Sequence, residues 1–487
     1  MISSLRLGAL SAALLAVGVG TLGAGGAMAD ASPTAGTAVS SLKFGACPDQ
    51  AGAPRGVACA TLKVPLDYAK PNGKQITLTV SGTGSLQAEH FLLVNPGGPG
   101  SPGIGTEKLV FSQLPEAVAD KYAVFSFDPR GVGVSTPITC GRPKELAFAR
   151  PAPVYQPAND AAEQYRVEHA RRIAKSCAAH AKNLPYITVP NEVRDMERIR
   201  IALGKDKIDY LGYSAGSILG ATYATMYPTH TGRMILDSVV DPTTTDYGSA
   251  FVQDPALEKR FGALQKWVAA RDRTYHFGTT SAAVRKTWKG MRKQLIAHPA
   301  GGRSGGAELD DLLASSTYDD ASWPDLMSAL KAYRQGDSGE LLAATDQLEE
   351  ASVDPGQLAY NCSQPGWPTN WKTWHRDTVR ANRTSPTFAW LNTWYSAPCA
   401  FWPVPPVRSA KIGSVPVPPI LLLQSTHDAA TPLSGAQHMR AVLPNSRLLV
   451  RAGGNHASYL NDKNKCIDTK AANYWLTGTL PADAKCK

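Results

Sequence analysis

The chain has 487 residues, of which 43% are hydrophobic, so it is long enough for one large domain or two ordinary ones with a substantial core. Its net charge of +10 comes from 50 basic residues scattered among 40 acidic ones, without a run of lysine and arginine. This pattern favours a solvated, mildly basic surface and argues against a nucleic-acid-binding protein.

The first 29 residues have the pattern of an export signal. A short apolar run follows the single charge at Arg6, and small residues end at Ala27-Met28-Ala29. These features predict cleavage after Ala29. A membrane anchor needs about twenty strongly apolar residues, whereas this run is short and rich in glycine. We therefore expect a secreted protein with no membrane contact, in which residues 30–42 form a flexible leader or propeptide.

Export makes disulfides the expected state of the cysteines. The chain has eight of them, well separated and without a C-x-x-C pair, which favours disulfides over a zinc site. Many pairings are possible, and pairing between neighbours in sequence is the simplest, because each pair then lies within one segment. This expectation joins Cys47 to Cys59, Cys140 to Cys177, Cys362 to Cys399, and Cys466 to Cys486.

The order of apolar and helical patterns is that of an α/β protein. Strands alternate with helices, and polar residues follow the carboxyl ends of several strands. This predicts a mostly parallel, doubly wound sheet with a functional site along that edge. The expected strands lie at 60–64, 75–80, 91–94, 122–127, 207–211, 234–236, 419–424 and 446–450, and the flanking helices include 160–182, 190–203 and a terminal helix near 470–476.

The composition shifts between residues 242 and 405, where helical patterning dominates and nine of the ten tryptophans lie. We expect this segment to be a helical cap inserted between two late strands of the sheet. The core would then consist of residues 43–241 and 406–487. The tryptophans could form the core of the cap itself, or some of them could line a pocket beneath it.

A strand, a sharp turn and a helix surround Ser214. The turn is Gly212-Tyr213-Ser214-Ala215-Gly216, between the apolar run at 207–211 and a helical segment at 218–224. This context makes the G-x-S-x-G pattern a nucleophile elbow, in which the glycines make room for a strained serine. We expect the hydroxyl of Ser214 to be the nucleophile and the amide of Ala215 to face the developing oxyanion.

Two further polar loops supply partners for Ser214. Asp428 and His456 each follow an apolar strand, and the chain order serine, aspartate, histidine is that of α/β-hydrolases. His456 would accept the serine proton, and Asp428 would hold the imidazole in the correct tautomer. His427 is a rival histidine, but it adjoins Asp428 in the same loop, where neighbouring side chains would point apart.

Two loops after earlier strands have different expected roles. The loop at 95–103 has four glycines in nine residues, so its exposed amides suit an oxyanion site, with Gly98 as the expected donor beside Ala215. Asp128 and Arg130 follow the next strand, and we expect them to be a structural pair that braces a loop.

These motifs resemble those of the secreted tripeptidyl aminopeptidases of actinomycetes, which are proline iminopeptidase-like serine peptidases with the α/β-hydrolase fold. The resemblance rests on segments 95–100, 128–133 and 424–432, on the elbow, and on cap segments 362–377 and 398–403; it covers nearly everything after residue 42. It implies a secreted exopeptidase without metal or cofactor that removes tripeptides from free peptide or protein N-termini. The family's triad maps onto Ser214, Asp428 and His456. We further expect a monomer.

The chain departs from the family pattern at two places. Ala215-Gly216-Ser217 follows the serine where relatives usually carry Tyr-Gly-Thr, and the smaller Ala215 enlarges the pocket floor. Asn361, with Gln364 beyond it, stands where relatives often carry an acid that could bind the substrate's ammonium group. Glu258 lies where a second family acid lies, and is either the substrate-binding acid or a solvated helix residue.

Two other functions fit part of the pattern. A secreted carboxylesterase or lipase of the same fold would use the same triad, because that triad serves any acyl transfer. A catalytically inactive binding homologue is less compatible with an intact triad and glycine loop. The sequence therefore favours a serine exopeptidase that forms an acyl-enzyme on Ser214.

Overall fold

A computed structural model describes residues 41–142, 146–349 and 354–487. The expected signal peptide and nearly all of the expected leader lie outside these residues. Within the described ranges, no helix combines the length and apolar character needed to cross a bilayer.

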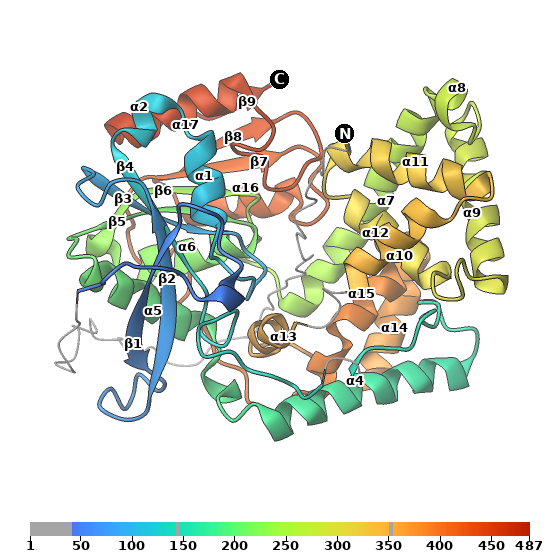
Figure 1. The fold of residues 1–487 in the computed structure, drawn as a ribbon, viewed down its shortest axis with the longest axis horizontal. Coiled ribbons are helices and arrows are strands. Elements are labelled where there is room, and N and C mark those ends of the chain that lie inside the picture. The colour runs from blue at the N-terminus through green and yellow to red at the C-terminus, as the bar shows by residue number, and fades with distance from the viewer. Residues whose placement is uncertain (1–40, 143–145, 350–353) are drawn as a thin grey trace.

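Across the described residues, nine strands form one sheet in the order β1-β2-β4-β3-β5-β6-β7-β8-β9 (Figure 1). β2 pairs antiparallel with β1 and β4, and all other neighbours are parallel, which confirms the mostly parallel sheet. The strands are β1 (Ala58–Pro65), β2 (Gln75–Thr83), β3 (His90–Asn95), β4 (Tyr122–Phe127), β5 (Ile208–Tyr213), β6 (Thr231–Asp237), β7 (Ile420–Ser425), β8 (Arg447–Arg451) and β9 (Ala484–Cys486).

Helices cover both faces of this sheet, so its central strands are buried on both sides. In β3, Leu93 packs into the hydrophobic core on one face, whereas Leu92 and Val94 pack into the core on the other. The first face carries α5 (Val189–Ala202), α6 (Ala215–Met226) and α16 (Leu433–Val442); the second carries α1 (Thr106–Gln113), α2 (Glu116–Ala119) and α17 (Lys465–Thr477). We refer to the sheet with these six helices as the sheet lobe.

A second lobe, the cap lobe, is formed by the helices between β6 and β7 (Figure 1). It has its own hydrophobic core, which includes Leu257, Phe261 and Leu313. Helix α4 (Asp160–His180), from the first part of the chain, packs Val167 against Trp394 of this lobe. The helices of the insert are α7 (Asp246–Ala269), α8 (Asp272–Tyr275), α9 (Ser281–Ala297), α10 (Gly306–Ser316), η4 (Asp320–Ser322), α11 (Trp323–Arg334), α12 (Gly339–Glu349), α13 (Pro355–Cys362), α14 (Trp371–Asn382), α15 (Ala389–Ser396) and η5 (Ala397–Phe401).

Five tryptophans of the cap lobe stack in a row. Ring centroids lie 5.7 Å apart between Trp367 and Trp374, and 5.9 Å apart between Trp374 and Trp371. The row continues from Trp371 to Trp394 at 4.9 Å and from Trp394 to Trp390 at 5.7 Å. Trp374, Trp390 and Trp394 are buried. These tryptophans therefore form a core within the cap lobe.

The eight cysteines form four disulfides, Cys47–Cys59, Cys140–Cys177, Cys362–Cys399 and Cys466–Cys486. This is the pairing between sequence neighbours that the sequence predicted.

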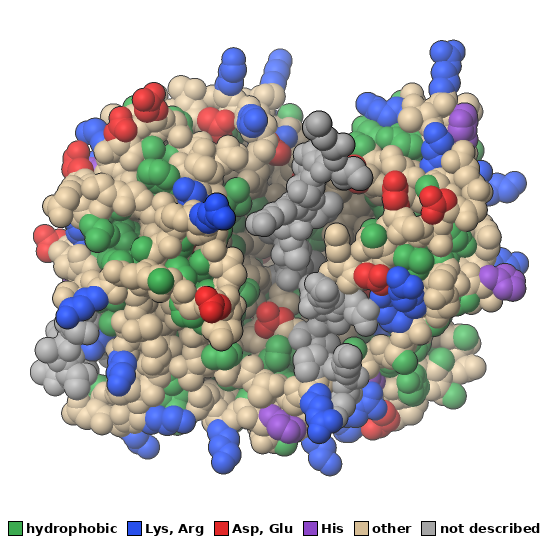
Figure 2. All heavy atoms as spheres, in the orientation of Figure 1, with side chains coloured by type: hydrophobic (Ala, Val, Ile, Leu, Met, Phe, Trp, Pro, Cys, Tyr) green, Lys and Arg blue, Asp and Glu red, His purple; other side chains and the backbone are tan. Residues whose placement is uncertain are grey.

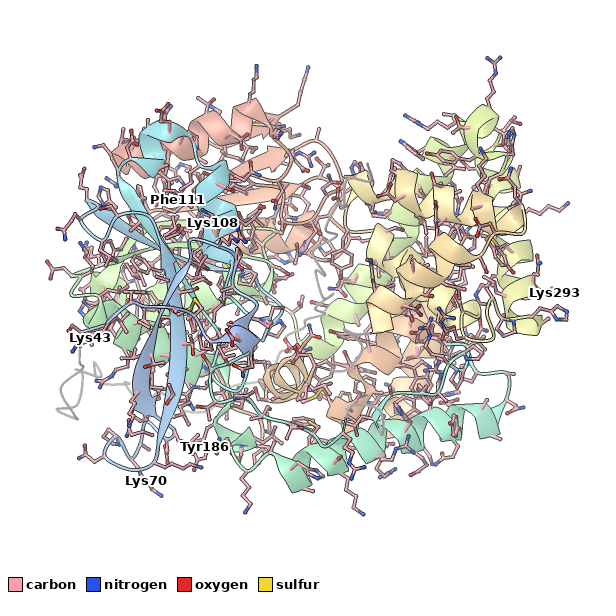
Figure 3. All side chains as sticks on the ribbon, in the orientation of Figure 1. Lys43, Lys70, Lys108, Phe111, Tyr186 and Lys293 are labelled. Carbon is pink, nitrogen blue, oxygen red and sulfur yellow. A yellow bond between two sulfur atoms is a disulfide. The ribbon has the colours of Figure 1, made fainter. Side chains whose placement is uncertain are left out.

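Basic side chains occupy separate places on the surface. Figure 3 labels Lys43, Lys70 and Lys108 on the sheet lobe and Lys293 on the far side of the cap lobe. Figure 2 likewise shows lysine and arginine side chains distributed around both lobes, with a hollow between the lobes on this face. The visible face thus agrees with the scattered charge in the sequence.

Two sequence expectations need correction, and three helices were missed. Asp128 and Arg130 do not pair with each other: Asp128 accepts from the amides of Gly103 (2.9 Å) and Val134 (2.8 Å), while the buried Arg130 pairs with Asp195 at 2.6 Å. Both still brace loops. The terminal helix does not close the chain, because the short strand β9 follows it. Helices α1, α2 and α16 were not expected from the sequence.

Candidate active site

Ser214 lies in the sharp turn between β5 and α6, with a φ of 53° and a ψ of −123°. A positive φ is costly for a serine, so the surrounding chain must hold it. The glycines make this possible, because a Cβ on Gly212 would lie 2.6 Å from the carbonyl carbon of Gly216. The amide of Ser214 donates to the carbonyl oxygen of Asp237 at the end of β6 (2.9 Å). The turn therefore has the expected geometry of a nucleophile elbow.

Ser217, one of the departures from the family pattern, fixes the far side of this turn. Its hydroxyl donates to the carbonyl oxygen of Ser214 (2.6 Å) and accepts from the amide of Val240 (3.0 Å). The serine at this position thus connects the elbow to the loop after β6.

The glycine loop after β3 lies directly against the elbow. A Cβ on Gly97 would be 2.9 Å from the Cβ of Ser214 and 3.2 Å from the amide nitrogen of Ala215. Gly98 follows with a φ of 112°, which only glycine adopts without strain. The structure therefore brings the loop of Gly98 together with Ala215, which is the arrangement that two oxyanion donors need.

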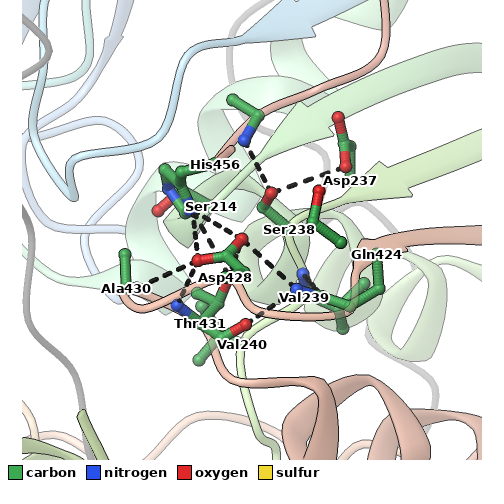
Figure 4. Close-up of polar contacts among 12 residues, drawn as sticks. Ser214, Asp237, Ser238, Val239, Val240, Gln424, Asp428, Ala430, Thr431 and His456 are labelled. Atoms are coloured by element: carbon green, nitrogen blue, oxygen red, sulfur yellow. Dashed lines mark hydrogen bonds and ion pairs between the residues drawn. The ribbon is translucent and has the colours of Figure 1, made fainter. Parts of the chain in front are cut away.

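Asp428 lies in the loop after β7 and is 1% exposed. All of its hydrogen-bond partners in the described residues are donors. Its Oδ1 accepts from the amides of Ala430 and Thr431 (2.9 Å each), and its Oδ2 accepts from the Thr431 hydroxyl (3.0 Å) and Gln424 Nε2 (3.2 Å). These bonds leave the carboxylate with one orientation, toward His456 (Figure 4).

His456 Nδ1 lies 2.9 Å from Asp428 Oδ2 and 3.1 Å from Asp428 Oδ1. Because a carboxylate only accepts, Nδ1 must donate, and the neutral imidazole then keeps its lone pair on Nε2. The rival His427 is exposed, whereas Asp428 beside it is buried. The structure therefore joins Asp428 with His456 and not with His427, and the catalytic roles of these residues stay a prediction.

The loop of His456 is tied to the same end of β6 as the elbow. The amide of Ala457 donates to the hydroxyl of Ser238 (2.7 Å), the residue after Asp237. Figure 4 shows Ser214, Asp428 and His456 gathered around this strand end. The three residues come from separate loops at the carboxyl edge of neighbouring strands β5, β7 and β8, with β6 between β5 and β7.

Three effects act on the imidazole of His456. Burial lowers its pKa, but the carboxylates of Asp428 and Asp237 outweigh burial, so the pKa of His456 lies above its ordinary value. Asp237 is itself fully buried, and burial raises its pKa to about 7. The site therefore has a histidine whose charged form is favoured, as a base that must hold a proton during a reaction requires.

Comparison with known proteins decides the family. Residues 385–486 match a family model described as TAP-like protein. The tripeptidyl aminopeptidase of Streptomyces lividans is 37% identical to this chain over 462 residues, which covers 89% of this chain and 84% of that protein. The chain belongs to the tripeptidyl aminopeptidase family. It is an α/β-hydrolase serine peptidase.

Two mycobacterial proteins are also similar to this family member. The serine protease Hip1 of Mycobacterium tuberculosis is 28% identical over 89% of this chain and 88% of that protein. Carboxylesterase B of the same species is 31% identical over 87% of this chain and 85% of that protein.

In this tripeptidyl aminopeptidase family member, Glu258 lies on α7 and already has two partners. Arg285 Nη2 lies 2.9 Å from its Oε2, and the amide of Thr387 donates to its Oε1 (2.6 Å). One helical turn earlier, Asp254 is 1% exposed and accepts from Asn392 Nδ2 (2.7 Å); burial raises the pKa of Asp254 to about 7. The two acids therefore form a pair on one face of α7.

Asn361 lies on α13 and is 2% exposed. Within the described residues its Oδ1 has no hydrogen-bond partner. Gln364, two residues after Cys362, is half-buried. Helix α13 itself packs against the glycine loop, since a Cβ on Gly100 would lie 2.9 Å from the amide of Gln357.

Sequence reasoning missed the residues that hold Asp428 and His456 in place. Gln424 and Thr431 belong to the motif at 424–432, but their bonds to Asp428 were not expected. Aspartate side chains in turns commonly accept from the backbone amide two residues on, which could have indicated the bond from Ala430. The contact of Tyr318 with His456 joins separate lobes, and no local spacing could have indicated it.

Proposed function

We propose that this serine peptidase is a secreted exopeptidase that releases tripeptides from free N-termini through an acyl-enzyme on Ser214. The observation that carries the proposal is the buried Asp428–His456 pair beside the elbow, with Nδ1 to Oδ2 at 2.9 Å. A serine hydroxyl is a weak nucleophile at neutral pH and needs such a base.

The proposed reaction has two halves. Ser214 Oγ attacks the scissile carbonyl carbon while His456 Nε2 takes the hydroxyl proton, and the amides of Gly98 and Ala215 bind the oxyanion. The tetrahedral intermediate collapses as His456 returns the proton to the leaving amine, which breaks the peptide bond. A water molecule, deprotonated by His456, then attacks the ester carbonyl carbon. His456 returns this proton to Ser214 Oγ as the ester bond breaks, and the released peptide has a free carboxylate.

Two features support an exopeptidase. The cap lobe closes over one side of the site, because Tyr318 contacts His456 and α13 packs against the glycine loop. The acidic pair on α7, of which Glu258 is the proposed anchor for the substrate's ammonium group, would favour a positively charged N-terminus.

Secretion is supported by the export pattern at the N-terminus and by the four disulfides, which persist in oxidising compartments. We propose peptide or protein N-termini as the substrates of a monomeric enzyme. Neither a metal nor a cofactor takes part in the proposed steps.

The proposal is tested with peptide anilides of increasing length that carry a free amine, their N-acetylated forms, and short neutral esters. We expect the free tripeptide anilide to have the highest kcat/KM and acetylation to lower it by orders of magnitude. Equal cleavage of free and acetylated peptides would contradict the exopeptidase proposal. Rapid ester hydrolysis without peptide cleavage would favour a carboxylesterase instead.

A further inference from the structure

The catalytic loop after β8 is held from the cap lobe as well as from the sheet lobe. The amide of His456 donates to the carbonyl oxygen of Tyr318 (2.8 Å), which follows α10. The ring of Tyr318 also meets the imidazole edge-on, with centroids 5.4 Å apart and an interplanar angle of 87°. One residue of the cap lobe therefore contacts both the backbone and the ring of His456.

The preceding residue of the catalytic loop makes a second connection. The amide of Asp320 donates to Asn455 Oδ1 (2.9 Å), and Asn455 Nδ2 donates to Asp462 (2.8 Å) in the sheet lobe. Segment 317–320 of the cap lobe and the loop carrying His456 are thus bonded at two successive residues.

Arg260 of α7 holds this segment in place. It is 4% exposed, and its Nε donates to the carbonyl oxygen of Thr317 (3.1 Å), while its Nη2 pairs with Asp320. The guanidinium also lies over the ring of Trp323, 5.0 Å from the centroid. A planar group with several fixed donors can hold two acceptors at once, which a lysine cannot do in the same geometry.

The catalytic loop leaves space for this arginine at Gly454. A Cβ on Gly454 would lie 2.7 Å from Arg260 Nε and would overlap the guanidinium. Gly454 does not have a positive φ, so its backbone does not itself require glycine. The close approach of Arg260 is the structural reason for glycine at this position.

We propose that Arg260 is a positioning residue for the reaction: through Thr317, Tyr318 and Asp320 it aligns the imidazole of His456 with Ser214. Docking of the cap lobe is then required for the chemical step, and not only for substrate binding. The inference rests on the proposed role of His456 as the base. It predicts that loss of Arg260 slows every acyl transfer at Ser214, whatever the substrate.

The test is the Arg260→Met variant, compared with Lys259→Met, which removes a cation from an exposed neighbouring position on the same helix. Active sites are titrated with a fluorophosphonate, so that kcat is expressed per active molecule. A displacement of about 1 Å at a reacting group costs on the order of 100-fold, so we expect kcat to fall between about 10-fold and 100-fold. The fall should be similar for a short ester and a peptide, with KM nearly unchanged.

If Arg260→Met does not fold, a second pair of variants tests whether the cap lobe positions His456. Tyr318→Ala removes the ring that contacts His456, whereas Tyr318→Phe keeps it. We expect Tyr318→Ala to lower kcat per active site by more than Tyr318→Phe does, because only the alanine variant loses the ring contact with His456. Restoration of part of the kcat in Arg260→Lys, which keeps the charge but has all its donors on a single nitrogen, would also support the proposal.

Two results would overturn the proposal. In the first, Arg260→Met lowers the number of titratable sites or the melting temperature while kcat per site stays at the wild-type value, so that the arginine is only structural. In the second, the variant raises KM for peptides and leaves ester hydrolysis unchanged, so that the segment acts on the substrate. If the wild-type enzyme fails to cut free-amine peptides, the proposed exopeptidase activity is refuted. The role of Arg260 is still tested in that case, because kcat for the short ester reports on the alignment of His456 with Ser214.

Discussion

Replacement of Asp428 by asparagine exchanges one carboxylate oxygen for an amide nitrogen, at a site where every partner in the described residues is a donor. Oδ1 faces the backbone amides of Ala430 and Thr431, which cannot change from donor to acceptor. The amide oxygen of the asparagine must therefore take the Oδ1 position, and its NH₂ group must face His456 Nδ1.

The imidazole can then accept at Nδ1 only in the tautomer that carries its proton on Nε2. That tautomer has no lone pair for the proton of Ser214, so we expect Asp428→Asn to fold and to lose its base. For this error of tautomer the loss in kcat is on the order of 10⁴-fold, which is about 5.5 kcal/mol of activation free energy. The assay measures kcat for a short ester and for a free-amine peptide. The variant is compared with wild type only if both have the same secondary structure.

The chain contains a matched control for this substitution. Asp241 accepts from His438 Nδ1 at 2.7 Å, but His438 is exposed and lies outside the proposed triad. Asp241→Asn should leave kcat within about twofold of wild type, because exposed pairs contribute little. Retention of more than about a tenth of wild-type kcat by Asp428→Asn would refute the assigned role of Asp428, since loss of a carboxylate that orients the base lowers kcat far more than tenfold.

Three further predictions follow from the site and the disulfides. Activity should fall as the pH drops through the raised pKa of His456, because the protonated base cannot accept from Ser214; a midpoint of kcat/KM well below the ordinary value of ~6.5 would contradict the assignment. Glu258→Gln should lower kcat/KM for free-amine peptides by orders of magnitude and spare short neutral esters, since losing one side of a buried ion pair costs roughly 3–5 kcal/mol; an equal loss on both substrates would count against an ammonium anchor. Replacing Cys362 and Cys399 by alanine opens a loop of 37 residues and should lower the free energy of unfolding by about 3–4 kcal/mol in a denaturant titration; an unchanged midpoint would show that this disulfide does not stabilise the cap lobe.

The central strands of the sheet could be predicted because burial on both faces leaves a continuous apolar run. β3 and β7 were found in this way, each followed by a loop of glycine or polar residues. β9 has three residues and no such pattern; its pairing with β8 and the Cys466–Cys486 disulfide hold it in the sheet. Strands this short are stabilised by tertiary contacts, which sequence periodicity does not record.

In the candidate site, too, some features could be predicted from the sequence and others could not. Ser214, Asp428 and His456 could be predicted because each follows a strand, and parallel strands bring such residues to one edge. The bonds from Tyr318 and Asp320 to the His456 loop depend on how the cap lobe docks. The expected pair of Asp128 with Arg130 was wrong for a related reason. The buried guanidinium of Arg130 pairs with Asp195 on α5, and not with the carboxylate nearest in sequence.

The most direct test of the account is to locate the nucleophilic residue. Wild-type protein is labelled with a fluorophosphonate, digested, and mapped by mass spectrometry, with Ser214→Ala labelled in parallel. We predict a single adduct on the peptide that carries Ser214, prevented by prior incubation with substrate and absent from the variant. An adduct on another residue, or labelling that persists in Ser214→Ala, would contradict the assignment of Ser214 as the nucleophile.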